Sequence, residues 1–248
     1  MARRLFFVDE MHGGRAAIGG EGAHHLTRVL RVEPGQRFEI AHEGQVYLAE
    51  VETARKNEVA FAILEKLPAR RTRPHVELFA ALIRFEKFEW IVEKATELGV
   101  AAIHPVVAER SEKGLEAAAW KRAERWRRIV REACEQSRRA TLPELADPLP
   151  ELPALPAGFT HRFVCDELAG ATPVVSALPA MRTKDDRIAL LIGPEGGWTD
   201  RERAGFEPGE WTPVSLGDSV LRAETAAIAA VAIVDAWWQP GGRVDALP

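Results

Sequence analysis

The chain has 248 residues, of which 46% are hydrophobic and 28% charged, and its net charge at pH 7 is −4. This composition is typical of a globular protein with one large or two smaller domains, and no apolar run approaches the roughly 18 residues of a membrane span. The charge is uneven: residues 1–73 and 74–140 each carry +2, whereas residues 141–248 carry −8. A basic face on the first two thirds therefore stays compatible with a nucleic-acid partner.

Cysteine usage and the first residues bear on the cellular compartment. Cys134 and Cys165 lie far apart in the sequence, and the first eight residues are too short and too soon charged for a signal peptide. We therefore expect a cytoplasmic protein with two reduced thiols.

The first seventy residues have the pattern of a small β-rich domain. A short strand at residues 4–8 precedes a helix at residues 22–31, which carries Leu26, Val29 and Leu30 on one side. After a Pro34-Gly35 turn, three strand-like runs follow at residues 37–41, 45–53 and 58–67. Several short strands joined by tight turns predict a small barrel.

Strand and helix alternate after a proline-flanked, arginine-rich linker at residues 68–74, which predicts domains at residues 1–73 and 74–248. Helices are predicted at residues 85–98, 115–139 and 224–238, and a short helix begins at Thr199, where Thr199 and Glu202 fit a capping box. Strands are predicted at residues 76–83, 100–107, 162–165, 188–192 and 212–216. This alternation indicates an α/β fold with a parallel sheet covered by helices.

A glycine-bearing segment, Gly193 to Gly197 (Gly-Pro-Glu-Gly-Gly), follows the end of an apolar strand. Glycines here let backbone groups approach a ligand closely, where a Cβ would clash. The spacing does not fit a dinucleotide-binding fingerprint, and Trp198-Thr199 stands where a phosphate-binding loop needs Lys-Ser/Thr. The alternative is a strained turn between strand and helix.

A second segment, Leu216 to Thr225, contains Gly217, Arg222 and Glu224 between a strand and the last helix. Here the alternative is structural: Glu224 or Thr225 caps the helix, and Arg222 pairs with Glu224. Two such loops near one another in an α/β sheet are the usual place for a nucleotide-like ligand.

Together the two segments resemble the 16S ribosomal RNA uridine N3-methyltransferases of the trefoil-knotted, S-adenosylmethionine-dependent superfamily. The likeness extends over essentially the whole chain in one order. It includes Lys87–Val100 with its Glu-Leu-Gly-Val end, Ile103–Ser111 with its Glu-Arg-Ser turn, Ala133–Ser137, Leu142–Glu144, and His25–Arg31 followed by Pro34-Gly35.

The resemblance implies a trefoil-knotted α/β methyltransferase domain preceded by a small PUA-like β-barrel, working as a homodimer. The alanine-rich last helix and the exposed-looking Trp237-Trp238 pair are compatible with a dimer, and core packing explains them equally well. S-adenosylmethionine would be held mainly by backbone groups. The implied cofactor residues are Ile192, Gly193, Pro194, Glu195, Gly196, Gly197, Leu216, Gly217, Ser219 and Leu221, with Asp166 and Glu167 at the rim.

Methylation at uracil N3 requires loss of the N3 proton. Arg222 is our candidate for stabilising the resulting anion, since a permanent cation near O2 or O4 favours the deprotonated base. Arginine is a poor proton acceptor, so water, Glu224 or a group of a second subunit remains as the base. The reaction requires no metal, and the His24-His25 pair has no further cluster to complete a site.

RNA contacts are expected on basic faces, where phosphates fix position without reading sequence. The candidates are Arg28, Arg31, Arg70, Arg71, Arg73, Arg138 and Arg139, with Lys121, Arg122, Arg125 and Arg128 on the outer side of the long helix. Such charges are otherwise the solvated side of an amphipathic helix. Two other functions stay open: another knotted methyltransferase acting on a ribose 2′-hydroxyl or a tRNA base, and a non-catalytic RNA-binding ribosome-assembly protein.

Overall fold

The computed structural model describes residues 4–68, 74–151, 158–168, 170–208 and 210–239. The chain forms two compact units: the barrel unit comprises residues 1–71 and 131–142, and the sheet unit comprises residues 72–130 and 143–248. The end of the long helix thus belongs to the barrel unit. The domain boundary at residue 73 falls outside the described residues and stays a prediction.

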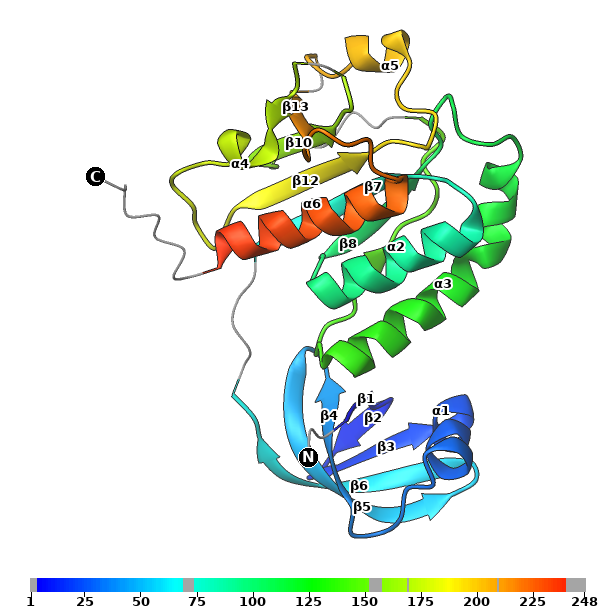
Figure 1. The fold of residues 1–248 in the computed structure, drawn as a ribbon. Helices are drawn as coiled ribbons and strands as arrows, with labels where there is room; N and C mark the ends of the chain where they lie inside the picture. The colour runs from blue at the N-terminus through cyan, green and yellow to red at the C-terminus, as the bar shows by residue number, and fades with distance from the viewer. Residues whose placement is uncertain (1–3, 69–73, 152–157, 169, 209, 240–248) are drawn as a thin grey trace. The chain divides into compact units, whose positions relative to one another are not determined.

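The barrel unit is built on one six-stranded sheet in the order β1-β4-β5-β6-β3-β2. Its strands are β1 (Leu5–Phe7), β2 (Glu10–His12), β3 (Arg15–Gly19), β4 (Arg37–His42), β5 (Gln45–Arg55) and β6 (Glu58–Lys66). β1 pairs with β4 in parallel, and the other neighbours are antiparallel. Because the edge strands β1 and β2 are joined by only Val8 and Asp9, the sheet curls on itself, as predicted (Figure 1).

Two strands of this barrel, β2 and β3, are absent from the sequence prediction. β2 is three residues long with exposed Glu10 and His12, so it carries no apolar alternation. β3 alternates only weakly, with Ala16 and Ile18 buried and the terminal glycine lowering its strand propensity. Both strands form because β6 offers β3 an antiparallel partner, a tertiary contact that the local sequence does not announce.

The first predicted helix is a short α-helix, α1 (Gly20–His24), followed by a π-helix, η1 (His25–Val29). Leu26 is buried as expected, whereas Val29 is 64% exposed. The expectation for Val29 was wrong because the wider π turn, seen in the bond from Leu30 N–H to the His25 carbonyl, breaks the spacing of three residues.

The sheet unit contains a seven-stranded parallel sheet in the order β11-β13-β10-β12-β7-β8-β9, as the strand–helix alternation predicts. Its strands are β7 (His75–Ala81), β8 (Ala102–Val106), β9 (Glu144–Leu145), β10 (His161–Cys165), β11 (Thr172–Pro173), β12 (Arg187–Ile192) and β13 (Thr212–Ser215). Its helices are α2 (Phe85–Leu98), α3 (Leu115–Ser137), α4 (Val174–Ala177), α5 (Asp200–Ala204) and α6 (Ala223–Trp238). Among the described helices, none is long and apolar enough to cross a membrane.

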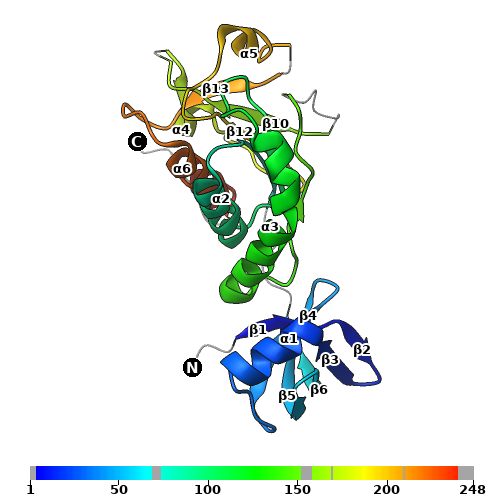
Figure 2. The ribbon, with the colours of Figure 1, turned by 90° about the vertical axis from the view of Figure 1, so that its right-hand side faces the viewer.

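Helices α2 and α6 lie side by side on one face of this sheet (Figures 1 and 2). α2 buries Phe88, Ile91 and Val92 and stops at Gly99, whose φ of 103° is the left-handed conformation that ends helices. On the opposite face, Phe79 and Leu191 of the sheet pack with Trp198 and Trp211. The sheet is therefore covered on both faces, which leaves its strand ends as the place for a site.

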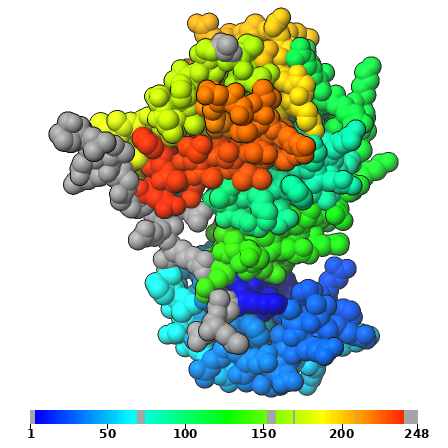
Figure 3. Space-filling view, viewed as in Figure 1, coloured from blue at the N-terminus to red at the C-terminus, as the bar shows by residue number. Residues whose placement is uncertain are grey.

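The last helix, α6, is buried along one side and half-buried along the other, so the expectation of deep burial holds for one face (Figure 3). The Trp237-Trp238 pair is not an exposed patch. Trp238 is 8% exposed and its Nε1 donates to Asp186, while Nε1 of the half-buried Trp237 donates to the Pro179 carbonyl. Each indole ring is apolar except for its N–H group, and the fold provides a hydrogen-bond acceptor for that group.

Candidate functional site

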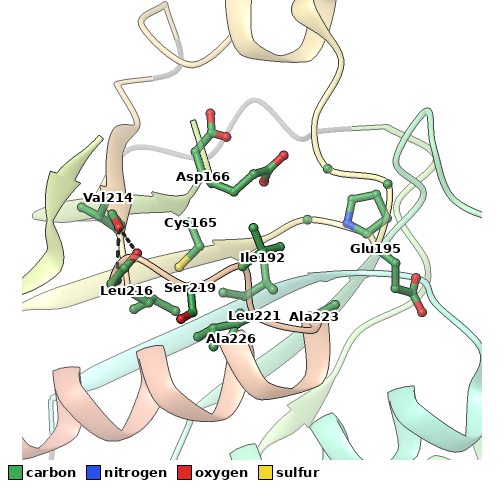
Figure 4. A pocket seen from close by; sticks show the side chains of 18 residues that line it. Cys165, Asp166, Ile192, Glu195, Val214, Leu216, Ser219, Leu221, Ala223 and Ala226 are labelled. Atoms are coloured by element: carbon green, nitrogen blue, oxygen red, sulfur yellow. Dashed lines mark hydrogen bonds between the residues drawn. The ribbon is translucent and has the colours of Figure 1, made fainter. Parts of the chain in front are cut away.

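A cavity of about 180 Å³ opens where β10, β12 and β13 end (Figure 4). These three strands are neighbours in the sheet and run in parallel, so Cys165, Ile192 and Ser215 end at one edge. The first turn of α6 closes the cavity through Ala223 and Ala226. Carboxyl ends of neighbouring parallel strands are the usual ligand position in open α/β sheets.

All of the residues that the sequence assigns to cofactor binding line this one cavity. They are Asp166, Ile192, Gly193, Pro194, Glu195, Gly196, Gly197, Leu216, Gly217, Ser219 and Leu221. The wall also includes Glu167, which was expected at the rim, and residues that were not predicted: Cys165, Val214, Ser215, Val220, Ala223 and Ala226. Most of these adjoin predicted positions in the chain. The structure brings the predicted set together, and its role in binding stays a proposal.

The first wall of the cavity is the segment from Gly193 to Gly197, which needs glycine at specific positions. A Cβ on Gly193 would lie 2.9 Å from Cε2 of Trp198, whose ring is fully buried and whose Nε1 donates to the Cys165 carbonyl. Gly197 has a φ of 66°, a left-handed conformation that favours glycine. The segment is therefore a constrained turn that lines the cavity.

Two arginines hold this wall from outside the cavity. Arg110, in the turn after β8, donates from Nη1 to the Gly196 carbonyl at 2.7 Å. Arg203, on α5, donates from Nη1 to the Trp198 carbonyl at 2.6 Å and makes two hydrogen bonds of 2.9 Å to the Asp166 carboxylate. Neither arginine was singled out from the sequence, although Arg110 stands in the Glu-Arg-Ser turn of the resemblance.

The charges at the rim are therefore already paired. Burial would raise the pKa of Asp166, but the hydrogen bonds and charge of Arg203, with backbone hydrogen bonds from Leu168 and Glu167, together hold that pKa below its usual value. Burial raises the pKa of the nearby Cys165 thiol to about 12, so this thiol is not a nucleophile. The capping box predicted at Thr199 and Glu202 is present at the start of α5.

The second wall runs from Leu216 to Ala223 and has few internal contacts. Ser215 Oγ accepts from the Gly217 N–H and donates to the Gly217 carbonyl, as the dashed lines in Figure 4 mark. Val220 is 82% exposed and Leu221 36% exposed. This wall is open to solvent.

The two predicted catalytic residues lie beside the second wall and are not among the residues lining the cavity. Arg222 is exposed at the N-cap of α6, and its side chain has no partner within the described part of the chain. Glu224 is buried, and its carboxylate lies 3.5 Å from Nζ of Lys87 on α2. The structural alternatives for this segment were wrong in detail: Arg222, not Thr225 or Glu224, is the N-cap, and Glu224 faces Lys87.

The predicted RNA-binding arginines differ in their surroundings. Arg28 and Arg31 are exposed on the barrel unit, whereas Arg138 pairs with the buried carboxylate of Glu39 and has a φ of 59°. Arg139 is half-buried near Cys134. Arg70, Arg71 and Arg73 lie outside the described residues. On α3, Arg122 and Arg125 pair with Glu89 of α2. The contact of Arg138 gives it a structural role in the barrel unit.

Family models match both halves of the chain. A model described as an RNA methyltransferase domain matches residues 70–235, and one described as an RNA methyltransferase PUA domain matches residues 18–64. The fold and the cavity thus define an RNA methyltransferase domain preceded by a PUA domain.

Curated relatives narrow this class. Ribosomal RNA small subunit methyltransferase E of Aquifex aeolicus is 31% identical over 92% of this chain and 97% of the relative. The protein of the same name from Synechocystis is 37% identical over 86% of this chain and 70% of the relative. The chain belongs to the family of ribosomal RNA small subunit methyltransferase E.

Solved structures agree with this assignment. The family member from Neisseria gonorrhoeae, bound to S-adenosyl methionine, has a TM-score of 0.82 at 27% identity and covers 96% of this chain and 98% of its own. A putative methyltransferase from Legionella pneumophila with bound cofactor has a TM-score of 0.83 at 29% identity and covers 95% of this chain and 98% of its own. The predicted fold class, a trefoil-knotted α/β domain after a small PUA-like β-barrel, is confirmed.

Proposed function

We propose that this protein transfers the methyl group of S-adenosylmethionine to N3 of a specific uridine in 16S rRNA of the small ribosomal subunit. The observation that carries the proposal is the single cavity at the ends of β10, β12 and β13, which collects every residue assigned to the cofactor. Relatives named ribosomal RNA small subunit methyltransferase E, and solved neighbours with bound S-adenosylmethionine, support the cofactor and the RNA class.

The residues of the cavity fit S-adenosylmethionine. Gly193 and Gly197 line the cavity, and a Cβ at either position would collide with Trp198 or Glu167. Ile192, Leu216 and Leu221 add apolar surface for the adenine and ribose, and backbone groups between them supply hydrogen bonds. The bound cofactor supplies an electrophilic methyl group, so the protein mainly places the nucleophile in line with it.

Arg222 is the residue that we assign to the chemistry. Its guanidinium is exposed at the edge of the open wall and has no partner among the described residues, so it is available to an incoming base. A fixed positive charge beside O2 or O4 stabilises the uracil anion that forms when the N3 proton leaves. The target uridine must leave its stack to reach this edge.

Solvent is the proton acceptor that we propose. Arg222 itself is exposed, so water reaches its side chain. Glu224, the protein candidate for the base, lies behind the wall against Lys87 and does not line the cavity. We therefore propose that Glu224 acts on the position of this wall.

We further propose a homodimer that covers the open wall. Val220 and Leu221 present apolar surface there, and the outer side of α6 is half-buried and apolar. The residues of that side are Ala226, Ile228, Ala229, Ala232, Ile233 and Trp237. A second copy that buries this surface would gain about 25 cal/mol per Å² of apolar area.

The RNA would meet exposed cations, Arg28 and Arg31 among them. We propose that the enzyme acts on this RNA in the cytoplasm.

The test is methyl transfer from labelled S-adenosylmethionine to small subunits that lack the modification, followed by nucleoside analysis. Label in 3-methyluridine supports cofactor, reaction and base together. Label in a 2′-O-methylated nucleoside, or in tRNA only, overturns the target atom or the RNA. Absence of both label and cofactor binding overturns the enzyme and favours the non-catalytic RNA-binding protein.

A further inference from the structure

Lys87 stands between the two walls of the cavity. It is the third residue of α2, and its Nζ lies 3.5 Å from Oε1 of Glu224 and 3.9 Å from Oε1 of Glu195. Glu195 belongs to the first wall, and Glu224 belongs to the first turn of α6, which follows the second wall. One ammonium group is therefore shared by carboxylates from the two segments that form the site.

The burial of the three side chains shows which contact costs most to lose. The Glu224 side chain is only 7% exposed, and its Oε2 makes no hydrogen bond within the described residues, whereas the Glu195 side chain is 44% exposed. A buried carboxylate is strongly destabilising without a counter-charge. Lys87, at 34% exposed, supplies that charge to Glu224 from the neighbouring helix.

The position of Glu224 also sets the position of Arg222. Arg222 is the N-cap of α6, and Glu224 is the second residue of the same helix, so both move with its first turn. The second wall ahead of Arg222 is open and has few internal contacts, so it cannot hold this turn in place. The turn is instead held by the packing of α2 against α6 and by the contact of Lys87 with Glu224.

We propose that Lys87 is a positioning residue for methyl transfer, because its ammonium group ties the cofactor wall to the helix turn that carries Arg222. This inference rests on the proposed function. The contact with Glu195 keeps the first wall in its cofactor-binding shape. The contact with Glu224 keeps Arg222 at the distance that the reaction needs, and small errors in such placement lower turnover steeply.

The two contacts have separable kinetic effects. Loss of the Glu195 contact alters the wall that holds the cofactor, so E195Q raises KM for S-adenosylmethionine and leaves kcat near its normal value. Loss of the Glu224 contact alters the turn that carries Arg222, so E224Q lowers kcat with little change in KM. Lys87→Met removes both contacts and changes both constants.

The experiment compares K87M, E195Q, E224Q, K87R and the double variant K87M/E224Q with Lys94→Met as the matched control. Lys94 lies on the same helix and pairs with Glu93 and Glu97 of that helix. We expect K87M to lower kcat about tenfold and to raise KM for S-adenosylmethionine about fivefold. K94M leaves both constants within about twofold of wild type, because its pairs are surface contacts.

The double variant and the conservative variant separate positioning from other roles. K87M/E224Q is expected to be no worse than K87M, since removing both charges leaves no uncompensated carboxylate. K87R keeps the charge and is expected to recover most of the lost kcat. If Glu224 were instead the direct base, E224Q alone would lower kcat by about 100-fold or more, and neither Lys87 variant would match it.

Several outcomes overturn the inference. K87M with wild-type kcat and KM would remove Lys87 from the site, and so would fully additive effects in K87M/E224Q. If K87M does not fold in thermal unfolding, E195Q decides, because Glu195 is exposed and its loss leaves the core intact; an unchanged KM in E195Q then rejects the proposal. Calorimetric binding of S-adenosylmethionine to wild type is measured first, so absence of that binding marks failure of the proposed function instead.

Discussion

The two walls of the cavity are built differently. The first, from Gly193 to Trp198, is held by hydrogen bonds from Arg110 and Arg203 and by the buried ring of Trp198. The second, from Leu216 to Arg222, has one serine contact and an 82% exposed valine. Both have a glycine just after the end of a strand, so the difference comes from what the fold packs behind each.

This difference bears on both binding and chemistry. A wall that is rigid before the ligand arrives costs no ordering entropy on binding, which suits a cofactor used in every turnover. A wall that is open admits a large substrate and can be covered by another chain. The proposed reaction uses both, since the cofactor residues that we assign come from both walls and Arg222 stands at the edge of the open one.

The largest expected effect comes from breaking the rigid wall with Gly193→Ala. The added Cβ would lie 2.9 Å from the buried Trp198 ring, so the ring or the turn must move. We expect affinity for S-adenosylmethionine, measured by calorimetry, to fall by about 100-fold. Gly19→Ala is the control, because its Cβ meets only ordinary contacts at 3.9 Å in the barrel unit. Normal affinity in the Gly193 variant would show that the wall is not rigid.

On the open wall, Arg222→Ala is expected to lower catalysis with almost no effect on cofactor binding. The cation is removed while the cofactor wall stays intact, so kcat falls about 100-fold and cofactor affinity stays within about twofold. Arg201→Ala, on the exposed side of α5, serves as the control. Unchanged turnover in single-turnover assays would exclude Arg222 from the chemistry.

Asp166→Asn tests the ion pair that supports the rigid wall. The side chains of Asp166 and Arg203 are 5% and 17% exposed, so we expect the unfolding free energy at neutral pH to fall by about 3 kcal/mol in urea titrations. Asp200→Asn is the control, because Asp200 is fully exposed and 3.9 Å from the same arginine, and it should change nothing measurable.

The same pair gives a pH dependence with a defined sign. The folded-state pKa of Asp166 lies below its ordinary value of 3.8, because burial, which raises it, is outweighed by the hydrogen bonds and charge of Arg203 together with backbone hydrogen bonds. A depressed pKa stabilises the fold above pH 3.8, and that stabilisation is lost as the pH falls through the folded-state value. The gap between wild type and Asp166→Asn should therefore close in acid. A gap that persists there would point to packing instead of charge.

The smallest effect on folding is expected from Val220→Ser on the open wall. The side chain is 82% exposed, so the unfolding free energy of the isolated chain should change by less than about 0.5 kcal/mol. If a second copy covers this wall, the same change weakens the dimer in sedimentation analysis. Val175→Ser, 56% exposed at α4, is the control for a valine elsewhere. If both variants dimerise equally strongly, the open wall is not part of the dimer interface.

Local patterns predicted the elements whose cause is local. The bounds of α2 agree with the prediction residue for residue, because apolar side chains recur at helical spacing and Gly99 supplies the left-handed stop. The capping box at Thr199 likewise depends on contacts three residues apart. By contrast, β9 and β11 are two residues long, so they exist only because a neighbouring strand pairs with them.

The two glycine segments, their strand ends and the family likeness could be read from the order of residues, because each depends on chemistry within a few positions of the chain. The strand order that places Cys165, Ile192 and Ser215 at one edge could not, since pairing partners lie far apart in sequence. The same reason hides Arg110 behind Gly196 and Lys87 between Glu195 and Glu224. Charges and rings of this kind look like ordinary surface or core residues until the fold brings their partners within hydrogen-bonding distance. The sequence by itself therefore determined what the cavity is made of, and only the tertiary structure decided which wall is rigid and which is open.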